Sequence, residues 1–280
     1  IPHLIVCVNK MDLVEYKEER FQEIVREYEQ FAAKLDVADI RFIPISALHG
    51  DNVVDRSEKM DWFQGSTLLY TLETIHIGSD QNHIDARFPV QTVIRPHSDE
   101  YHDYRGYAGR VAGGIFRPGD NVVVLPSGFK SKIKTIDLLG ENLTQAFPPM
   151  SVSMTLEDDI DVSRGDMIVR ENSQPRTSQD LEVMLCWLNE HPMELGGKYI
   201  LRQTTNESRV MIKDVVYKMD INNLSRQEGE KSASMNEIVK VHMRSTKPII
   251  LDSYRRNRQT GSIILIDEAT NETVAAGMIV

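Results

Sequence analysis

The chain has few cysteines, a deficit of basic residues and no long apolar run, and each absence narrows what it can be. Cys7 and Cys186 are its only cysteines, too few for a disulfide framework and typical of a reducing cytosol, so we expect a cytoplasmic protein. No apolar run approaches the roughly 20 residues that cross a membrane. The formal net charge of −10 argues against a nucleic-acid partner, which would require a basic face.

The sequence also lacks Gly-x-x-x-x-Gly-Lys-Ser/Thr, the loop whose backbone N–H groups cradle nucleotide phosphates and whose hydroxyl binds magnesium. No Asp-x-x-Gly precedes residue 9 either. Both motifs belong to the hydrolysis machinery of GTP-binding domains. We therefore assign no catalytic residue and no metal ligand within this sequence.

The most informative motif that is present is Asn9-Lys10-Met11-Asp12, which follows the apolar run Leu4–Val8. An Asn-Lys-x-Asp tetrad at the exit of a buried strand is typical of the loop with which GTP-binding domains read guanine. The Asp12 carboxylate can accept hydrogen bonds from both the ring N1–H and the exocyclic amine of guanine, a donor pair that adenine lacks. Asn9 would tie the loop and contact the purine, and the Lys10 stem would lie along the base and ribose.

A second motif lies at the expected distance along the chain. The apolar run between Ile40 and Ile45 is ended by Ser46-Ala47-Leu48. In GTPases a Ser-Ala pair after the next strand offers the alanine N–H to guanine O6. Tetrad, helix, strand and Ser-Ala occur in the right order, which a chance tetrad would not explain. We predict that guanine is bound by Asn9, Lys10, Asp12, Ser46, Ala47 and Leu48.

The chain begins at Ile1, without Met. Since the phosphate-binding motifs are also absent, we expect the front of the GTPase domain to lie upstream of residue 1. GTP would then contact this sequence only through its guanine end, and Mg²⁺ would bind only with the missing N-terminal part. The fragment alone is expected to be inactive.

Residues 1–77 have an α/β pattern. Apolar residues recur at helical spacing within Glu15–Leu35, and Arg41–Ser46 is short and apolar, as parallel strands are. Ser66 is expected to cap a second, shorter helix. Two parallel strands with two helices resemble the back of a doubly wound sheet. We therefore predict the C-terminal part of an α/β P-loop GTPase domain, with apolar surface left open.

After residue 77 the apolar period becomes twofold, and short strands alternate with turns, as in small β-barrels. Polar segments at 78–82 and 174–178 are read as linkers, which predicts barrels at 84–173 and 178–280. The predicted fold is thus multidomain, with the GTPase part followed by two all-β barrels. Strands of the first barrel are expected at Phe88–Arg95, Tyr107–Val111, Asn121–Leu125, Lys130–Leu138, Ser151–Leu156 and Met167–Arg170. Those of the second are expected at Leu181–Leu188, Lys198–Gln203, Arg209–Asp220, Glu237–Arg244, Pro248–Leu251, Ser262–Asp267 and Thr273–Ile279.

This layout resembles the translation-factor GTPase superfamily of elongation factor Tu. The run Gly109–Ile115 followed by Arg117–Asp120 looks like that superfamily's barrel signature. Narrower motifs closely resemble the large subunit of bacterial sulfate adenylyltransferase, and they extend over essentially the whole chain. They are Asp51–Val54, Met60–Trp62, Tyr104–Gly109, Val124–Gly128, Ile160–Asp166, Asp220–Leu224, Thr260–Asp267 and Gly277-Met278.

The resemblance implies a concrete task. In that family a small partner subunit makes adenosine 5′-phosphosulfate and pyrophosphate from ATP and sulfate, an unfavourable reaction. The large subunit hydrolyses GTP to drive it, so the resemblance implies a heterodimer or higher assembly with the small catalytic subunit. Such coupling requires GTP and GDP states that interact differently with the partner.

Two other functions remain open from sequence. One is an elongation-factor-like GTPase that binds aminoacyl-tRNA, against which the narrow motifs and the acidic charge speak. The other is a non-enzymatic scaffold that only binds the small subunit. Absence of tRNA binding together with partner-dependent GTP turnover would separate the sulfate-activation hypothesis from the tRNA-binding one. Complex formation without GTP turnover would support the scaffold hypothesis for the fragment.

Several residues allow a functional and a structural interpretation. A metal site among His97, Asp99, His102 and Asp103 competes with a polar hairpin tip, which is favoured. The Arg164-Gly165-Asp166 tripeptide is interpreted as a hairpin turn.

The aromatic pair Trp62-Phe63 could anchor a partner or cover the core, with neither interpretation favoured. Tyr254–Arg258 is a basic cluster that could contact an anion or a partner, although a solvated loop is favoured. Cys7 is expected to be a packed thiol on a buried strand.

Overall fold

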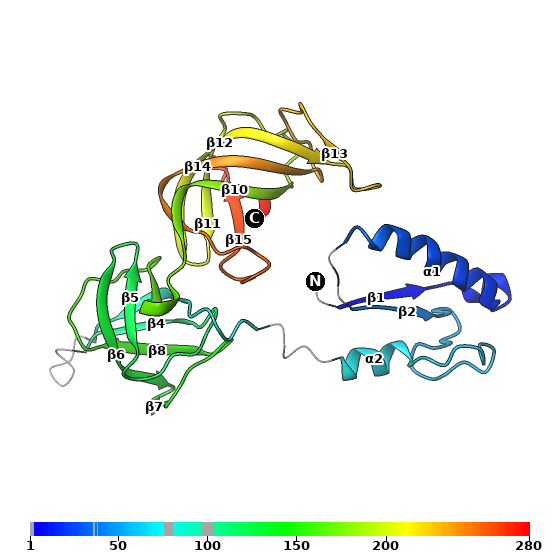
Figure 1. Cartoon of the computed structure of the whole chain (residues 1–280), viewed down its shortest axis with the longest axis horizontal. Coiled ribbons are helices and arrows are strands. Elements are labelled where there is room, and N and C mark those ends of the chain that lie inside the picture. The colour runs from blue at the N-terminus through cyan, green and yellow to red at the C-terminus, as the bar shows by residue number, and fades with distance from the viewer. Residues whose placement is uncertain (1–2, 36, 38, 76–80, 97–103) are drawn as a thin grey trace. The chain divides into compact units, whose positions relative to one another are not determined.

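The computed structural model describes residues 3–35, 37, 39–75, 81–96 and 104–280 (Figure 1). The chain divides into two compact units, Ile1–Asp80 and Gln81–Val280. The candidate metal ligands at positions 97–103 lie outside the described residues. No helix in the described parts of the chain is long and apolar enough to cross a membrane.

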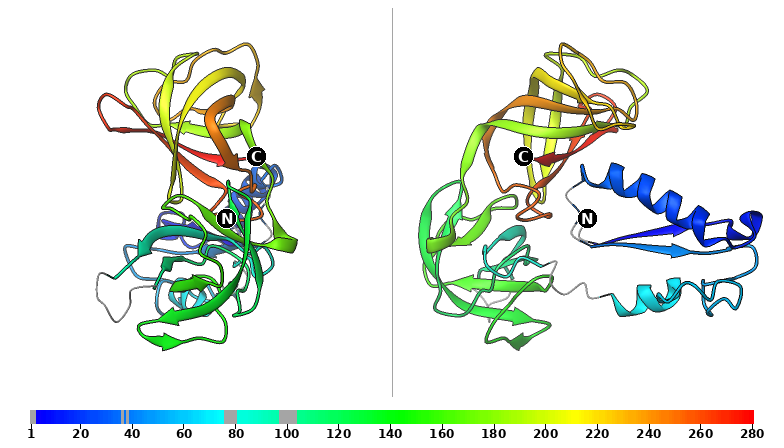
Figure 2. Two further views of the ribbon diagram at one scale, coloured as in Figure 1. Left: turned by 90° about the vertical axis from the view of Figure 1, so that its left-hand side faces the viewer. Right: turned by 45° about the vertical axis from the view of Figure 1, so that its right-hand side comes forward.

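The first unit is a small α/β layer structure. Strands β1 (His3–Val8) and β2 (Asp39–Pro44) pair in parallel, and helices α1 (Glu18–Ala32) and α2 (Leu68–Thr74) lie on opposite sides of this pair (Figures 1 and 2). The core on the α1 side contains Val8, Met11, Phe21 and Met60. A parallel pair with helices on both faces is the arrangement predicted for the GTPase part.

Local details of this unit differ from the predictions. Helix α1 begins at Glu18 because Met11–Val14 forms a separate 3₁₀ turn, η1. Thr67, not Ser66, caps α2, since the Thr67 side chain accepts a hydrogen bond from the Tyr70 backbone N–H.

The expectation that Cys7 is a packed thiol is wrong, because its side chain is exposed. Alternation along β1 puts Val8 on the face packed against α1 and Cys7 on the other face. Trp62 and Phe63 pack against Phe21, with ring centroids at 5.4 and 6.2 Å. In this unit they therefore cover the core.

The second unit contains two closed six-stranded barrels, which confirms the predicted fold class. In the first, the strand order β5-β9-β3-β4-β8-β6 is closed by an added β5–β6 pairing, and the short β7 pairs antiparallel with the end of β6. Its strands are β3 (Phe88–Ile94), β4 (Gly106–Arg110), β5 (Asn121–Leu125), β6 (Phe129–Leu138), β7 (Glu141–Asn142), β8 (Ser151–Leu156) and β9 (Met167–Arg170).

The second barrel follows a short 3₁₀ turn, η4 (Glu171–Ser173). Its order β11-β15-β16-β10-β14-β12 is closed by the β11–β12 pairing, with β13 added beside β12. Its strands are β10 (Thr177–Trp187), β11 (Lys198–Gln203), β12 (Asn206–Met219), β13 (Arg226–Gln227), β14 (Ile238–Ile250), β15 (Ser262–Ile266) and β16 (Thr273–Ile279).

Alternating apolar residues build both barrel cores. In β14, Val239, Val241 and Met243 are buried while His242 is exposed, as the twofold period predicts. The sequence divided β14 into two strands at Pro248, whose missing N–H weakens a ladder. The strand nevertheless continues to Ile250, with a register shift in the β10–β14 pairing between Ser178 and Asp180.

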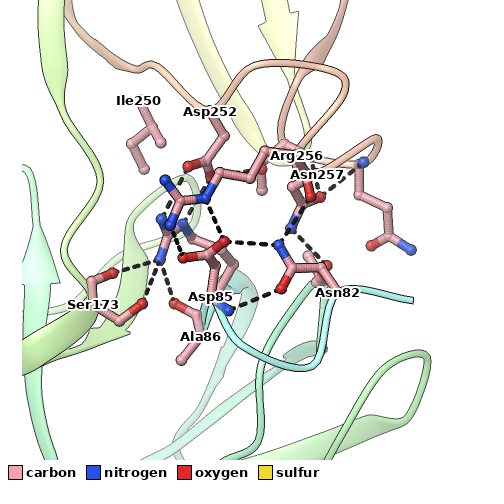
Figure 3. Close-up of polar contacts among 12 residues, drawn as sticks. Asn82, Asp85, Ala86, Ser173, Ile250, Asp252, Arg256 and Asn257 are labelled. Carbon is pink, nitrogen blue, oxygen red and sulfur yellow. Dashed lines mark hydrogen bonds and ion pairs between the residues drawn. The ribbon is translucent and has the colours of Figure 1, made fainter. Parts of the chain in front are cut away.

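The two barrels meet at a polar junction in which arginines pair with aspartates (Figure 3). Arg87 Nε and Nη2 donate to the two carboxylate oxygens of Asp252 at 2.7 and 2.9 Å. Arg256 donates to both oxygens of Asp85, each at 2.6 Å. Arg256 thus belongs to the barrel junction, although its side chain is 65% exposed. The favoured interpretation of Tyr254–Arg258 as a solvated loop is therefore wrong for Arg256 and for the buried Asn257, whereas Arg255 and Arg258 are exposed as it predicts.

Close backbone approach accompanies these ion pairs. Asn257 Nδ2 donates to the Ala112 carbonyl at 2.9 Å, and a Cβ at Gly113 would clash with the backbone carbonyl oxygen of Asp85. Only glycine leaves room there, which explains one position of the glycine-rich barrel signature.

The sequence treated the two barrels as separate domains with the limits 84–173 and 178–280. These domain limits stay predictions.

Candidate guanine-binding site

The ends of β1 and β2 bring the two predicted motifs together. Beyond the parallel pair, Ile45 N donates to Val8 O at 2.9 Å, and Met11 N donates to Ile45 O at 3.2 Å. These bonds extend the ladder past the strand ends, so the loops after β1 and β2 leave the sheet side by side. Loops at the carboxyl end of parallel strands are the usual ligand-binding position in α/β sheets.

Asn9 ties the first loop to the second. Its Oδ1 accepts hydrogen bonds from Lys10 N at 2.7 Å and from Ala47 N at 3.0 Å. Lys10 adopts the left-handed conformation, with φ 65° and ψ 34°, which turns the chain out of β1. The tying role that the sequence predicted for Asn9 therefore has a direct geometric counterpart.

Ser46 orients the Asp12 carboxylate. Its Oγ donates to Asp12 Oδ1 at 2.7 Å, and the Ser46 residue is fully buried, with 0% of its surface exposed. The same Oγ accepts from His49 N at 3.4 Å. Because a hydroxyl can donate once and accept from others, this arrangement commits the Ser46 proton to Asp12.

The donor and acceptor set fits a guanine base. Among the described residues, no hydrogen bond to Asp12 Oδ2 is found, and Oδ1 retains a second lone pair, so the carboxylate can accept from two ligand N–H groups. The Ala47 N–H, predicted to face guanine O6, donates to Asn9 instead. Guanine O6 would have to share that proton or take it over.

The six predicted residues lie on these two adjacent loops, but they differ in exposure. Ser46 is buried, Asp12 is half-buried, and Asn9, Lys10 and Ala47 are exposed. Leu48 is 81% exposed and offers an apolar surface next to the polar groups.

Sequence reasoning missed a second polar group beside these loops. Tyr16 Oη donates to Asp51 Oδ2 at 2.9 Å, and Ser57 Oγ donates to Asp51 Oδ1 at 2.8 Å. Burial raises the pKa of Asp51, but the hydrogen bonds from Ser57 and Tyr16 and the charge of Lys59 outweigh it and hold the pKa below its ordinary value. Asp51-Asn52 was noticed only as a family match, since nothing in the spacing links position 51 to position 16.

No group of three or more potential metal ligands occurs within the described ranges. Nothing described therefore offers a protein-only metal site, and the prediction that Mg²⁺ needs residues outside this sequence stays a prediction.

Two family models match the chain. The elongation factor Tu GTP binding domain matches residues 1–93, and the GTP-eEF1A C-terminal domain-like model matches residues 180–280. The first match includes both loops of the candidate site. The second covers most of the barrel that begins with β10.

Curated relatives match along the entire chain. The bifunctional enzyme CysN/CysC of Mycobacterium tuberculosis (strain CDC 1551 / Oshkosh) is 49% identical over 280 residues, which are 100% of this chain and 46% of that protein. Sulfate adenylyltransferase subunit 1 of Bacteroides fragilis (strain YCH46) is 49% identical over 280 residues, covering 100% of this chain and 58% of that protein. The chain thus spans about half the length of the curated relatives it matches.

Among solved structures, sup35 complexed with GMPPNP is similar in fold, with a TM-score of 0.66 and 21% identity over 100% of this chain and 69% of that one. That likeness concerns architecture alone. The full-length similarity to curated relatives and the match to the elongation factor Tu GTP binding domain agree with each other. The chain therefore belongs to the family of sulfate adenylyltransferase subunit 1, within the elongation factor Tu group of GTP-binding proteins.

Proposed function

We propose that the chain serves in the GTPase subunit of ATP sulfurylase, in the cytoplasm. GTP hydrolysis there would drive the synthesis of adenosine 5′-phosphosulfate from ATP and sulfate by a small catalytic subunit. The observation that carries this proposal is the Asp12 carboxylate held by the buried Ser46, with Asn9 bridging the same two loops. The names of the relatives supply the reaction to which this guanine site would belong.

In this proposal the described residues select the nucleotide. Asp12 would accept both donors of the guanine Watson–Crick edge, and a base lacking either donor would leave a desolvated acceptor without a partner. Asn9 and Ala47 would contact the other edge of the base, and Lys10 and Leu48 would flank its faces. Bound GTP would supply the phosphoanhydride bond whose cleavage releases free energy. Phosphate and Mg²⁺ contacts are not assigned to any residue here.

Energetic coupling between the subunits requires differential binding. The partner must distinguish the GTP-bound from the GDP-bound state. If the partner bound both states equally, GTP hydrolysis could not shift any equilibrium of the partner. The partner would be the small catalytic subunit, which also binds ATP, in a heterodimer or a higher assembly. No membrane or nucleic acid enters this proposal, and the charge of −10 opposes the aminoacyl-tRNA alternative.

The direct experiment is a GTPase assay on the complete natural protein that contains these residues. Turnover is measured with and without the candidate small subunit, with ATP and sulfate present. We expect GTP turnover to rise with the partner and to follow adenosine 5′-phosphosulfate formation. Turnover that is indifferent to partner and sulfate would contradict the assigned task, while leaving a GTP-binding protein of this architecture.

A further inference from the structure

We propose that Tyr16 and Asp51 form a latch that holds the two guanine-contacting loops in register and thereby sets the selectivity for guanine. This inference rests on the proposed function, because it assumes that the two loops bind guanine. It assigns a positioning role to two residues that do not themselves belong to the predicted guanine contacts.

The latch joins the two loops through residues that come after the predicted guanine contacts in each loop. Tyr16 follows Asp12 on the first loop, and Asp51 follows Ser46 on the second. Tyr16 Oη donates to Asp51 Oδ2 at 2.9 Å. The backbone transmits this contact on the second loop, since Ser46 N donates to Asp51 O at 3.1 Å. Displacing Asp51 would therefore displace the residue that orients Asp12.

The backbone at Tyr16 is strained in a way that needs such support. Glu15 and Tyr16 have φ values of 55° and 57°, so two successive residues with side chains occupy the left-handed region. A residue with a side chain occupies this region only at a cost in free energy, so the surrounding contacts must hold it there. The turn is held by Tyr16 N, which donates to Met11 O at 2.8 Å, and by Trp62 Nε1, which donates to Tyr16 O at 3.0 Å.

The acceptor of the latch is itself fixed in place. The Asp51 side chain is 11% exposed, and its other oxygen accepts from Ser57 Oγ at 2.8 Å. Lys59 Nζ donates to Tyr16 Oη at 3.1 Å and lies 3.5 Å from Asp51 Oδ2. The same ammonium is 4.8 Å from the centre of the Tyr16 ring. Two outside donors, Ser57 Oγ and Lys59 Nζ, thus converge on the Tyr16 hydroxyl and Asp51 carboxylate pair.

Loss of this latch should affect the selectivity for guanine more strongly than it affects the stability of the fold. Asp12 must accept two bonds from guanine at once, and a bidentate contact tolerates less misorientation than a single bond. Hypoxanthine keeps the ring N1–H and O6 of guanine but has no exocyclic amine. A loosened pair of loops would therefore weaken binding of a guanine nucleotide more than binding of an inosine nucleotide.

The test uses the complete natural protein with Tyr16→Phe, which removes only the hydroxyl. Dissociation constants for GDP and IDP are measured by calorimetry. We expect the dissociation constant for GDP to rise roughly three- to tenfold, which is less than for a hydrogen bond to a charged group that orients Asp12 directly, because the latch acts on Asp12 only through the second loop. The ratio of the IDP constant to the GDP constant should fall. Tyr70→Phe is the matched control, because Tyr70 is 58% exposed and its hydroxyl makes no hydrogen bond to a described residue.

A purely structural role for Tyr16 would lower the fraction of folded protein without changing the IDP/GDP ratio, so thermal unfolding is followed in parallel. Asp51→Asn serves as a second variant that keeps an acceptor but loses the charge, and it should lower the ratio less than Tyr16→Phe. Wild-type ratios in both variants would overturn the latch. A wild-type protein with no preference for GDP over IDP would instead contradict the proposed guanine site, so the two failures are distinguishable.

Discussion

The guanine loops and the barrel junction both join distant segments through aspartates, but they do so in opposite ways. At the junction, Arg87 and Asp252 are nearly inaccessible to solvent, with side chains 2% and 4% exposed. At the loops, Asp12 is half-buried and, among the described residues, its carboxylate accepts a hydrogen bond from Ser46 Oγ alone. The polar groups of the junction are paired with one another in hydrogen bonds within the chain, whereas the loops leave hydrogen-bond acceptors available to a ligand.

This difference indicates what each region is built to do. Arg87 Nη1 also donates to Ala86 O and Ser173 O, and Asp252 accepts a further bond from Thr260. A buried ion pair satisfied in this way fixes one geometry, although replacing it by apolar residues can cost little. A nucleotide site needs the reverse, because acceptors already paired within the protein cannot discriminate between bases.

The largest effect is expected from breaking the junction. Arg87→Met would leave Asp252 buried with only the Thr260 hydroxyl as a described side-chain partner, and an uncompensated buried charge costs about 3–5 kcal/mol. We expect the barrel segments of the complete protein to lose this much protection in native-state hydrogen exchange measured by mass spectrometry.

The matched control for this variant is Arg209→Met. Arg209 pairs with Glu268 at 2.7 Å, but its side chain is 73% exposed, so the loss should be about 0–1 kcal/mol. Equal losses in the two variants would show that burial does not distinguish the junction from an ordinary surface ion pair.

A smaller effect, on ligand affinity, is expected at the loops. Ser46→Ala removes the donor that orients Asp12, and a hydrogen bond to a charged group contributes about 1.5–3 kcal/mol. We expect GDP affinity, measured by calorimetry on the complete protein, to fall by roughly ten- to a hundredfold. Ser66→Ala is the control, since Ser66 is exposed and does not cap α2. Unchanged GDP affinity in Ser46→Ala would exclude the orienting role.

Periodicity predicted most of the fold because alternation and turn residues act locally. The strands β5, β8, β9, β11 and β16 have the predicted bounds, and the barrels close as expected. The ends of helix α1 were predicted less accurately, since the helix runs from Glu18 to Ala32 and not over the whole of Glu15–Leu35. The turn at Glu15 and Tyr16 depends on contacts from Asp51 and Trp62, which lie far along the chain.

The guanine motifs could be recognised because their residue types and order are fixed by the chemistry of the base. Asp85 and Arg256, in contrast, are 171 residues apart, and no local pattern links them. The basic cluster at 254–258 therefore looked like a solvated loop. Long-range polar pairing of this kind follows from how the two barrels pack, which periodicity does not encode.

Guanine recognition by this site is tested most sharply by exchanging the acceptor at its centre. In Asp12→Asn, one carboxylate acceptor becomes an amide donor, which complements the C2 carbonyl of xanthine rather than the amine of guanine. The variant of the complete natural protein is compared with the wild type for hydrolysis of GTP and xanthosine triphosphate. We expect the preference to shift from GTP toward xanthosine triphosphate. An unchanged preference for GTP would contradict the assignment of Asp12 as the residue that reads guanine.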